Sequence, residues 1–178
     1  MRHPSRLIVL TLTVAFLLIP LAALSLDAGQ QKEFDRISRL NMSDLTREAA
    51  RLLDQKYPSE DWDSYRFPSY VFSSDSVETG YKIAAKEPEL LGNPDIAIKE
   101  GGIPCYCFCD AMGHQSLLHC FWKNGKAGEA FDDHAADCNI CYGQAMLAFL
   151  WSNLGATEKE ILIGMEKRFS HLPKPNPH

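Results

Sequence analysis

Residues 138–155, CNICYGQAMLAFLWSNLG, are apolar over most of their length and predict one long helix. Asp137 precedes this run at a position that suits an N-cap, and Gly155 closes it. Cys138 and Cys141 would then stand on the first turn of the helix, three residues apart and on the same face. The positive end of the helix favours thiolate over thiol, which helps cysteines there to capture a metal ion.

Helical patterns continue on both sides of this run. Asn41 begins a pattern that runs to Tyr57 and is stopped by Pro58, and residues 34–40 either extend that helix or form a separate turn. Ser76 is expected to cap a helix over VETGYKIAAKE, and Pro88 to begin a short helical turn. A shorter helix is expected in SLLHCFW, from Ser116. The last helix is expected to follow the capping box of Thr157 with Glu160.

The aromatic segment 58–74 is expected to cover the core as a loop with at most one short strand. Because strand signals are scarce elsewhere, the sequence predicts an all-α fold, with an irregular Cys-rich segment packed against the helices. We expect a single helical domain over residues 26–172 and a disordered proline-rich tail over residues 173–178.

All six cysteines fall within residues 102–141, GIPCYCFCDAMGHQSLLHCFWKNGKAGEAFDDHAADCNIC, and three histidines lie between them. Thiolates interleaved with imidazoles are the ligands that a soft metal ion prefers, so metal binding is the leading hypothesis. Cys105, Cys107 and Cys109 alternate in an extended segment, and they can reach one ion only if that segment curls.

The N-terminus has the features of a secretory signal. Arg2, His3 and Arg6 precede the uncharged apolar residues 7–26, which Pro20 interrupts. Small residues at 23 and 25 suit a cleavage site, so residues 1–25 are expected to be a signal peptide. An uncleaved anchor is the alternative, because about 20 uncharged residues can just span a bilayer. In either case we expect the rest of the chain to be exported, to the periplasm, the medium or the outer side of a membrane.

The net charge of the chain limits the classes of partner that we expect. The chain has 18 basic and 23 acidic residues, and loss of Arg2 and Arg6 would leave a net charge of about −7. No basic run is present, so nucleic acid is not an expected partner, and membrane contact is expected only through an uncleaved N-terminal segment.

The stretches PCYCFC, GHQSLLHCF and DDHAADCNIC resemble the bacterial proteins named for a PCYCGC motif, a family of unknown function. The resemblance extends over roughly residues 81–169 and includes the lead-in YKIAAKEPELL. Phe108 stands where the family has glycine, and His119 lies outside the shared pattern. Carried over by position, the resemblance implies a site formed by Cys105, Cys107, Cys109, His114, Cys120, His134, Cys138 and Cys141.

The number of thiols bears on the choice of metal. Six thiolates exceed the four-ligand shell of one Zn²⁺, whereas Cu(I) ions share bridging thiolates, so a small Cu(I) cluster accommodates every cysteine. His134 is the best histidine ligand and His114 the next, with Asp132 and Asp133 as possible orienting groups. Met112 and Met146 offer thioether sulfur, although packing is the simpler role for both. The predicted function is Cu(I) buffering or delivery to a metal-receiving protein, with zinc as the alternative metal.

Three other interpretations of the cysteines remain open. The even count and the oxidising compartment suit three disulfides in a stapled interaction domain. An iron–sulfur cluster uses similar ligands, but the leader carries no twin arginine for folded export. The CNIC pair suits a thiol–disulfide oxidoreductase, but no βαβ pattern surrounds it. Because no serine–histidine–acid set, phosphate loop or HExxH is present, we expect a protein that is not an enzyme.

Overall fold

The computed structural model describes residues 26–92, 102–107, 112–114 and 116–172. Over these residues the regular structure consists of α-helices and short 3-10 turns, with two isolated β-bridges and no strand, which confirms the predicted all-α fold. The expected signal peptide, Cys109 and the expected tail lie outside the described residues. None of the helices in the described part of the chain is long and apolar enough to cross a membrane.

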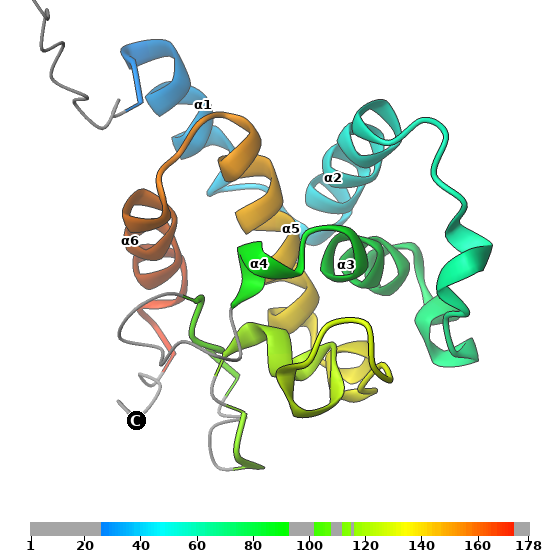
Figure 1. The fold of residues 1–178 in the computed structure, drawn as a ribbon. Coiled ribbons are helices and arrows are strands. Elements are labelled where there is room, and N and C mark those ends of the chain that lie inside the picture. Colours follow the sequence, from blue (N-terminus) through cyan, green and yellow to red (C-terminus); the bar gives the residue numbers. More distant parts are fainter. Residues whose placement is uncertain (1–25, 93–101, 108–111, 115, 173–178) are drawn as a thin grey trace, which may run out of the picture.

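The predicted apolar helix is α5 (Asn139–Asn153), and it occupies the centre of the fold. Figure 1 shows α1 (Ala28–Ile37) and α6 (Glu158–Phe169) on one side of α5, with α2 (Met42–Lys56) and α3 (Asp75–Lys86) on the other. The short α4 (Pro88–Leu91) also contacts α5. Every residue from 143 to 151 is buried, as expected for a helix that is apolar on all sides.

Two glycines allow the closest approaches to α5. A Cβ at Gly80 of α3 would lie 2.6 Å from the Cβ of Tyr142, and a Cβ at Gly164 of α6 would lie 2.9 Å from the Trp151 ring. On the same side of the core, Phe34 of α1 stacks on Trp151 with ring centroids 4.4 Å apart. The missing side chains therefore set how tightly α3 and α6 pack on the central helix.

Several predicted helix ends are confirmed. The Asn41 side chain caps α2, and Thr157 and Glu160 form the capping box of α6. Gly155 has a φ of 92°, the left-handed conformation that ends a helix. The residues upstream of Asn41 form α1 as a separate helix rather than an extension of α2.

Two predicted starts are wrong. The cap of α3 is Ser74, whose hydroxyl accepts from the backbone N–H of Val77, while the Ser76 hydroxyl bonds Thr46 of α2 instead. The cap position of α5 is Cys138 rather than Asp137, because Asp137 ends a preceding 3-10 turn, η6 (His134–Asp137).

The aromatic segment 58–74 contains two 3-10 turns, η1 (Trp62–Tyr65) and η2 (Ser69–Ser73), and no strand. Two of its aromatic rings pack against rings of the core. The centroid of the Phe67 ring lies 5.0 Å from that of Phe131, and the centroid of the Tyr70 ring lies 5.8 Å from that of Tyr81. This segment therefore covers one side of the core, as predicted. The helix expected from Ser116 is the 3-10 turn η4 (Leu117–Cys120).

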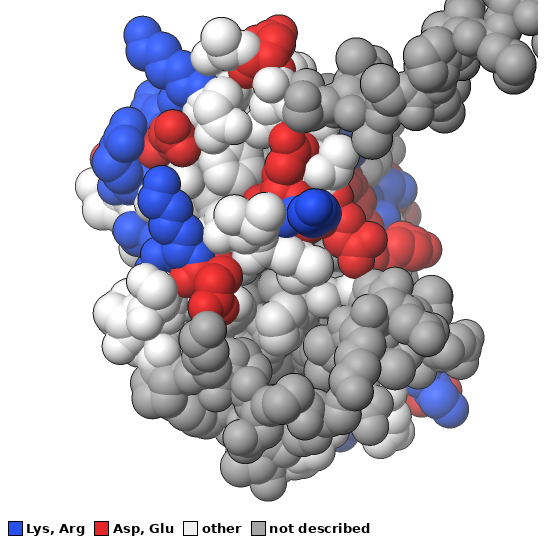
Figure 2. All heavy atoms as spheres, turned by 90° about the vertical axis from the view of Figure 1, so that its left-hand side faces the viewer, with Lys and Arg blue, Asp and Glu red and all other residues white. Residues whose placement is uncertain are grey.

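The surface around α1 and α6 carries both signs of charge. Figure 2 shows lysine and arginine side chains beside aspartate and glutamate side chains on this face, rather than a patch of one sign. The arrangement agrees with the absence of a basic run in the sequence.

Candidate metal centre

Four cysteine sulfurs converge at the N-terminal end of α5. The Sγ atoms of Cys105, Cys107, Cys120 and Cys141 all lie within 4.8 Å of one another. Cys105 Sγ is 3.2 Å from Cys107 Sγ, 3.4 Å from Cys120 Sγ and 3.5 Å from Cys141 Sγ. In a tetrahedral zinc site with Zn–S bonds of about 2.3 Å, sulfurs lie about 3.8 Å apart. These three pairs of sulfurs would therefore need to separate by about 0.3–0.6 Å to enclose one ion.

The four sulfurs come from three segments of the chain. Cys105 and Cys107 lie in the loop after Pro104, Cys120 ends η4, and Cys141 lies in the first turn of α5. The loop does curl between Cys105 and Cys107, as a shared ion requires. Cys105, Cys120 and Cys141 are buried, with 4%, 0% and 0% of their surface exposed, so the cluster is closed to solvent on that side.

Gln144, one helical turn beyond Cys141, holds the cysteine loop against α5. Its side-chain amide donates to the carbonyl of Pro104 at 2.9 Å and accepts from the backbone N–H of Tyr106 at 3.1 Å. The residue is fully buried, so both bonds are shielded from water. Tyr106 adds a second attachment, because its hydroxyl donates to Glu166 of α6 at 2.9 Å. The backbone on both sides of Cys105 is thereby fixed.

A second group of ligand atoms adjoins the four sulfurs. His114, Cys120 and His134 each place one ligand atom within 4.8 Å of the others. His114 Nδ1 lies 3.5 Å from Cys120 Sγ, and the two imidazole rings are nearly perpendicular with centroids 5.0 Å apart. His134 Nε2 also lies 3.7 Å from Cys107 Sγ. Cys120 is thus common to both groups.

The segment before α5 positions His134. The Tyr81 hydroxyl of α3 donates to the backbone carbonyl of Asp132 at 2.6 Å, and the Asp132 carboxylate accepts from the backbone N–H of His134 at 3.0 Å. Asp132 therefore orients His134 through its backbone rather than its ring. Asp133 is exposed.

The oxidation states of the cysteines test the alternative that they form three disulfides. Cys105, Cys120, Cys138 and Cys141 are thiols in this structure, whereas Cys107 is disulfide-bonded. A framework of three disulfides would use all six cysteines, so it is not the state seen here. Cys107 must be reduced before its sulfur can act as a thiolate ligand.

The converging cysteines differ in the pKa values of their thiols. Hydrogen bonds from Cys120 and Cys141 lower the pKa of Cys105 to about 4. The contacts with Cys105 raise the pKa values of Cys120 and Cys141. The cluster therefore holds a thiolate supported by neighbouring thiols. A cation bound among them would displace the remaining protons and make further thiolates available as ligands.

The other predicted ligands lie nearby or outside the description. Cys138 belongs to neither group; the Cys141 thiol and the backbone N–H groups of Cys141 and Ile140 lower the pKa of Cys138 to about 7. Cys109 is not described. Met146 is fully buried in the core, and Met112 is 59% exposed.

His119, which lies outside the shared pattern of the family, has a packing position. Its Nδ1 lies 3.1 Å from the Ser116 hydroxyl, and its ring covers Gly125 so closely that a Cβ there would lie 2.6 Å from it.

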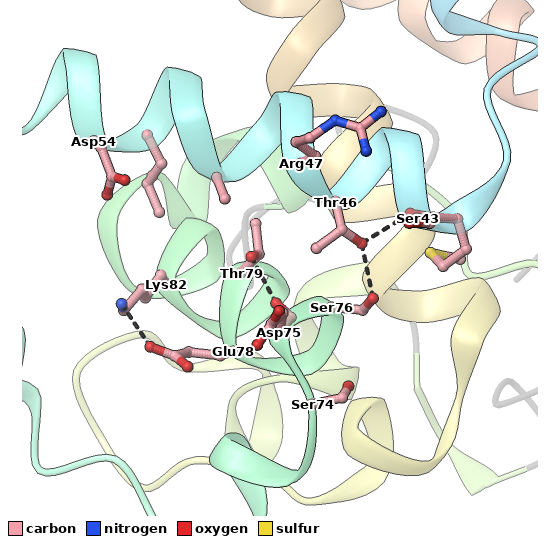
Figure 3. A pocket seen from close by; sticks show the side chains of 13 residues that line it. Ser43, Thr46, Arg47, Asp54, Ser74, Asp75, Ser76, Glu78, Thr79 and Lys82 are labelled. Atoms are coloured by element: carbon pink, nitrogen blue, oxygen red, sulfur yellow. Dashed lines mark hydrogen bonds and ion pairs between the residues drawn. The ribbon is translucent and has the colours of Figure 1, made fainter.

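A groove of about 810 Å³ between α2 and α3 has no cysteine or histidine among its described lining residues (Figure 3). Two pairs of its polar groups bond each other within the walls: the Thr46 hydroxyl bonds Ser76 at 2.7 Å, and Lys82 pairs with Glu78 at 2.7 Å. Among its described lining residues the thioether of Met42 is the single soft donor, so the groove does not match the cysteine cluster as a site for a soft metal ion.

Residues 17–175 match the family described as "Protein of unknown function with PCYCGC motif", and the chain belongs to this family. The match is longer than the resemblance seen in the sequence motifs, because it includes α1 and α2. Searches of curated proteins and of solved structures find no significant match. The two groups of cysteine and histidine ligands are therefore the main basis for a functional proposal.

Proposed function

We propose that this protein binds Cu(I) outside the cytoplasm and buffers it or delivers it to a metal-receiving protein, without catalysing a reaction. The supporting observation is the convergence of the sulfurs of Cys105, Cys107, Cys120 and Cys141 from three segments of the chain. A set of four sulfurs, three of them from buried cysteines, is suited to a soft ion, and Cu(I) is the softest common candidate outside the cytoplasm.

The sharing of Cys120 favours Cu(I) over a single Zn²⁺. One zinc ion needs only four ligands, whereas His114 and His134 bring two more within 4.8 Å of Cys120. Thiolates that bridge neighbouring Cu(I) ions would use both groups at once. Cys138, whose thiol lies next to Cys141, supplies a further sulfur at the edge of the cluster.

A structural zinc site is the second candidate. The four converging sulfurs equal the ligand number of one closed Zn²⁺ site, and three of the four cysteines are buried. In this case the ion would hold the cysteine loop, η4 and α5 together. His114 and His134 would then not coordinate the ion.

A titration separates the two candidates. The exported protein, reduced and stripped of metal under anaerobic conditions, is titrated with Cu(I) against a chromogenic Cu(I) chelator and, separately, with Zn²⁺ against a zinc indicator. We expect more than one equivalent of Cu(I) per chain to resist the chelator. Saturation at one equivalent together with tighter binding of zinc would replace the copper proposal with the structural site.

Export is supported by the charged and apolar pattern of residues 1–25. Mass spectrometry of the protein from its native host should find a mature chain that begins at Leu26. Recovery of the intact N-terminus in the membrane fraction would instead indicate an anchor.

A further inference from the structure

The two ligand groups differ in how far their side chains are exposed to solvent. In the first group Cys105, Cys120 and Cys141 are buried and Cys107 is partly exposed, whereas both histidines of the second group, His114 and His134, are partly exposed. The first group provides four sulfurs, enough to complete a tetrahedral shell. The second provides two imidazoles and one sulfur, which leaves a coordination position for a ligand from outside the protein.

Cys120 connects the two groups physically. Its sulfur lies 3.4 Å from Cys105 Sγ on one side and 3.5 Å from His114 Nδ1 on the other. A thiolate has lone pairs for two soft ions, so one sulfur in this position can bridge an ion in each group. His134 adds a second link, because its Nε2 lies 3.7 Å from Cys107 Sγ.

The partly exposed group is also held in place by the fold. The backbone of His134 is fixed by Asp132, which is in turn held by Tyr81 of α3. Cys120 ends η4, whose start is fixed by a 2.7 Å hydrogen bond from the backbone N–H of Leu117 to the carbonyl of Ile103. These contacts hold His134 and Cys120 in place relative to the core.

We infer that the protein has two chemically distinct metal sites that share Cys120: an enclosed four-sulfur site and an exchange site formed by His114, Cys120 and His134. The exchange site takes up a soft ion from solvent or from a carrier through its vacant coordination position, and it is the route by which ions leave the enclosed site. This inference rests on the proposed metal-binding function and specifies where exchange takes place.

The test compares Cu(I) stoichiometry and transfer in the reduced, metal-free protein. The double variant H114Q/H134Q removes both imidazoles, and H171Q is the matched control because His171 is an exposed histidine outside both groups. We expect the double variant to lose about one equivalent of Cu(I) relative to wild type and to release its remaining copper to a chelator more slowly, whereas H171Q matches wild type. C120S should weaken both sites, because it removes their common ligand.

Wild-type stoichiometry and transfer rate in H114Q/H134Q would overturn the exchange site and leave the four-sulfur site intact. Failure of wild type to bind any Cu(I) would instead overturn the proposed function itself. X-ray absorption at the copper edge of fully loaded wild type tests the same inference without a variant. We expect nitrogen scatterers from imidazole in addition to sulfur, and a shell of sulfur alone would contradict the exchange site.

Discussion

Cys138 and Cys141 form one CxxC pair, but the structure gives their sulfurs different surroundings. Cys141 Sγ lies within the four-sulfur group and is fully buried, whereas Cys138 is partly exposed and outside both groups. We expect C141S to weaken Cu(I) binding by more than about tenfold, because even supporting residues around a metal typically contribute 10- to 100-fold to affinity. C138S is the matched control and should retain the tightest site. Chelator competition measures both variants, and equal losses would contradict this assignment of ligands.

Among the four described thiols, Cys138 should also be the first to react with an alkylating agent in metal-free protein. Its pKa is lowered to about 7, and its side chain is partly exposed, whereas Cys105 is buried although its own pKa is lower. Since only the thiolate reacts, the alkylation rate should fall about tenfold per pH unit below pH 7 and level off above about pH 8. Peptide mass spectrometry after brief iodoacetamide treatment identifies the modified residue. Earlier modification of Cys105 would show that the cluster opens readily to solvent.

At the scale of elements, Gln144 connects the central helix to the cysteine loop. The substitution Q144L would leave the Tyr106 N–H and the Pro104 carbonyl buried without their partners, at a cost of about 1–3 kcal/mol for each group. We expect a lower melting temperature and weaker Cu(I) binding, because Cys105 would lose its fixed position. N153A removes another amide of α5, which donates to the carbonyl of Phe149 within the same helix, and serves as the control. Unchanged copper affinity in Q144L would show that the loop is held by other contacts.

The helices with strong local signals were predictable from sequence. The Asn41 cap of α2 and the capping box of Thr157 with Glu160 need only neighbouring residues, so they form as the pattern indicates. The start of α5 was not predictable in the same way. The turn η6 includes Asp137, and the segment before this turn is held by a hydrogen bond from Tyr81, a residue far away in the chain, to the carbonyl of Asp132.

The candidate site, like the helices, was predictable only in part from the sequence. The clustering of cysteines and histidines indicated a metal site, but the sequence alone could not separate the four-sulfur group from the group containing His114 and His134. That separation depends on how η4 and α5 pack. Gln144 was missed, although the sequence held one signal: it is a polar side chain inside the apolar run of residues 138–155, where a buried polar group needs hydrogen-bond partners.

For the whole molecule, Cys105, Cys120 and Cys141 belong to the hydrophobic core, but much of that core lies away from the four sulfurs. Trp151, Phe149 and Met146 of α5 are fully buried among the surrounding helices, and Phe34 of α1 stacks on Trp151 at the end of α5 away from Cys141. Burial of large side chains contributes about 1.5–3 kcal/mol each relative to exposure. A chain with such a core differs from small zinc domains, which are unfolded without their ion.

The metal-free, reduced protein should therefore be helical by circular dichroism, and metal should raise its melting temperature without changing the spectrum greatly. An ion at 100 times its dissociation constant stabilises the folded state by about 2.7 kcal/mol, if it does not bind the unfolded chain. For a chain of this size that corresponds to a shift of about 5–10 °C. The same melt in C141S is the control and should show a smaller shift, because one of the four sulfurs is absent. A random-coil spectrum of the metal-free protein, which becomes helical only on adding metal, would show that the ion is part of the core rather than bound beside it.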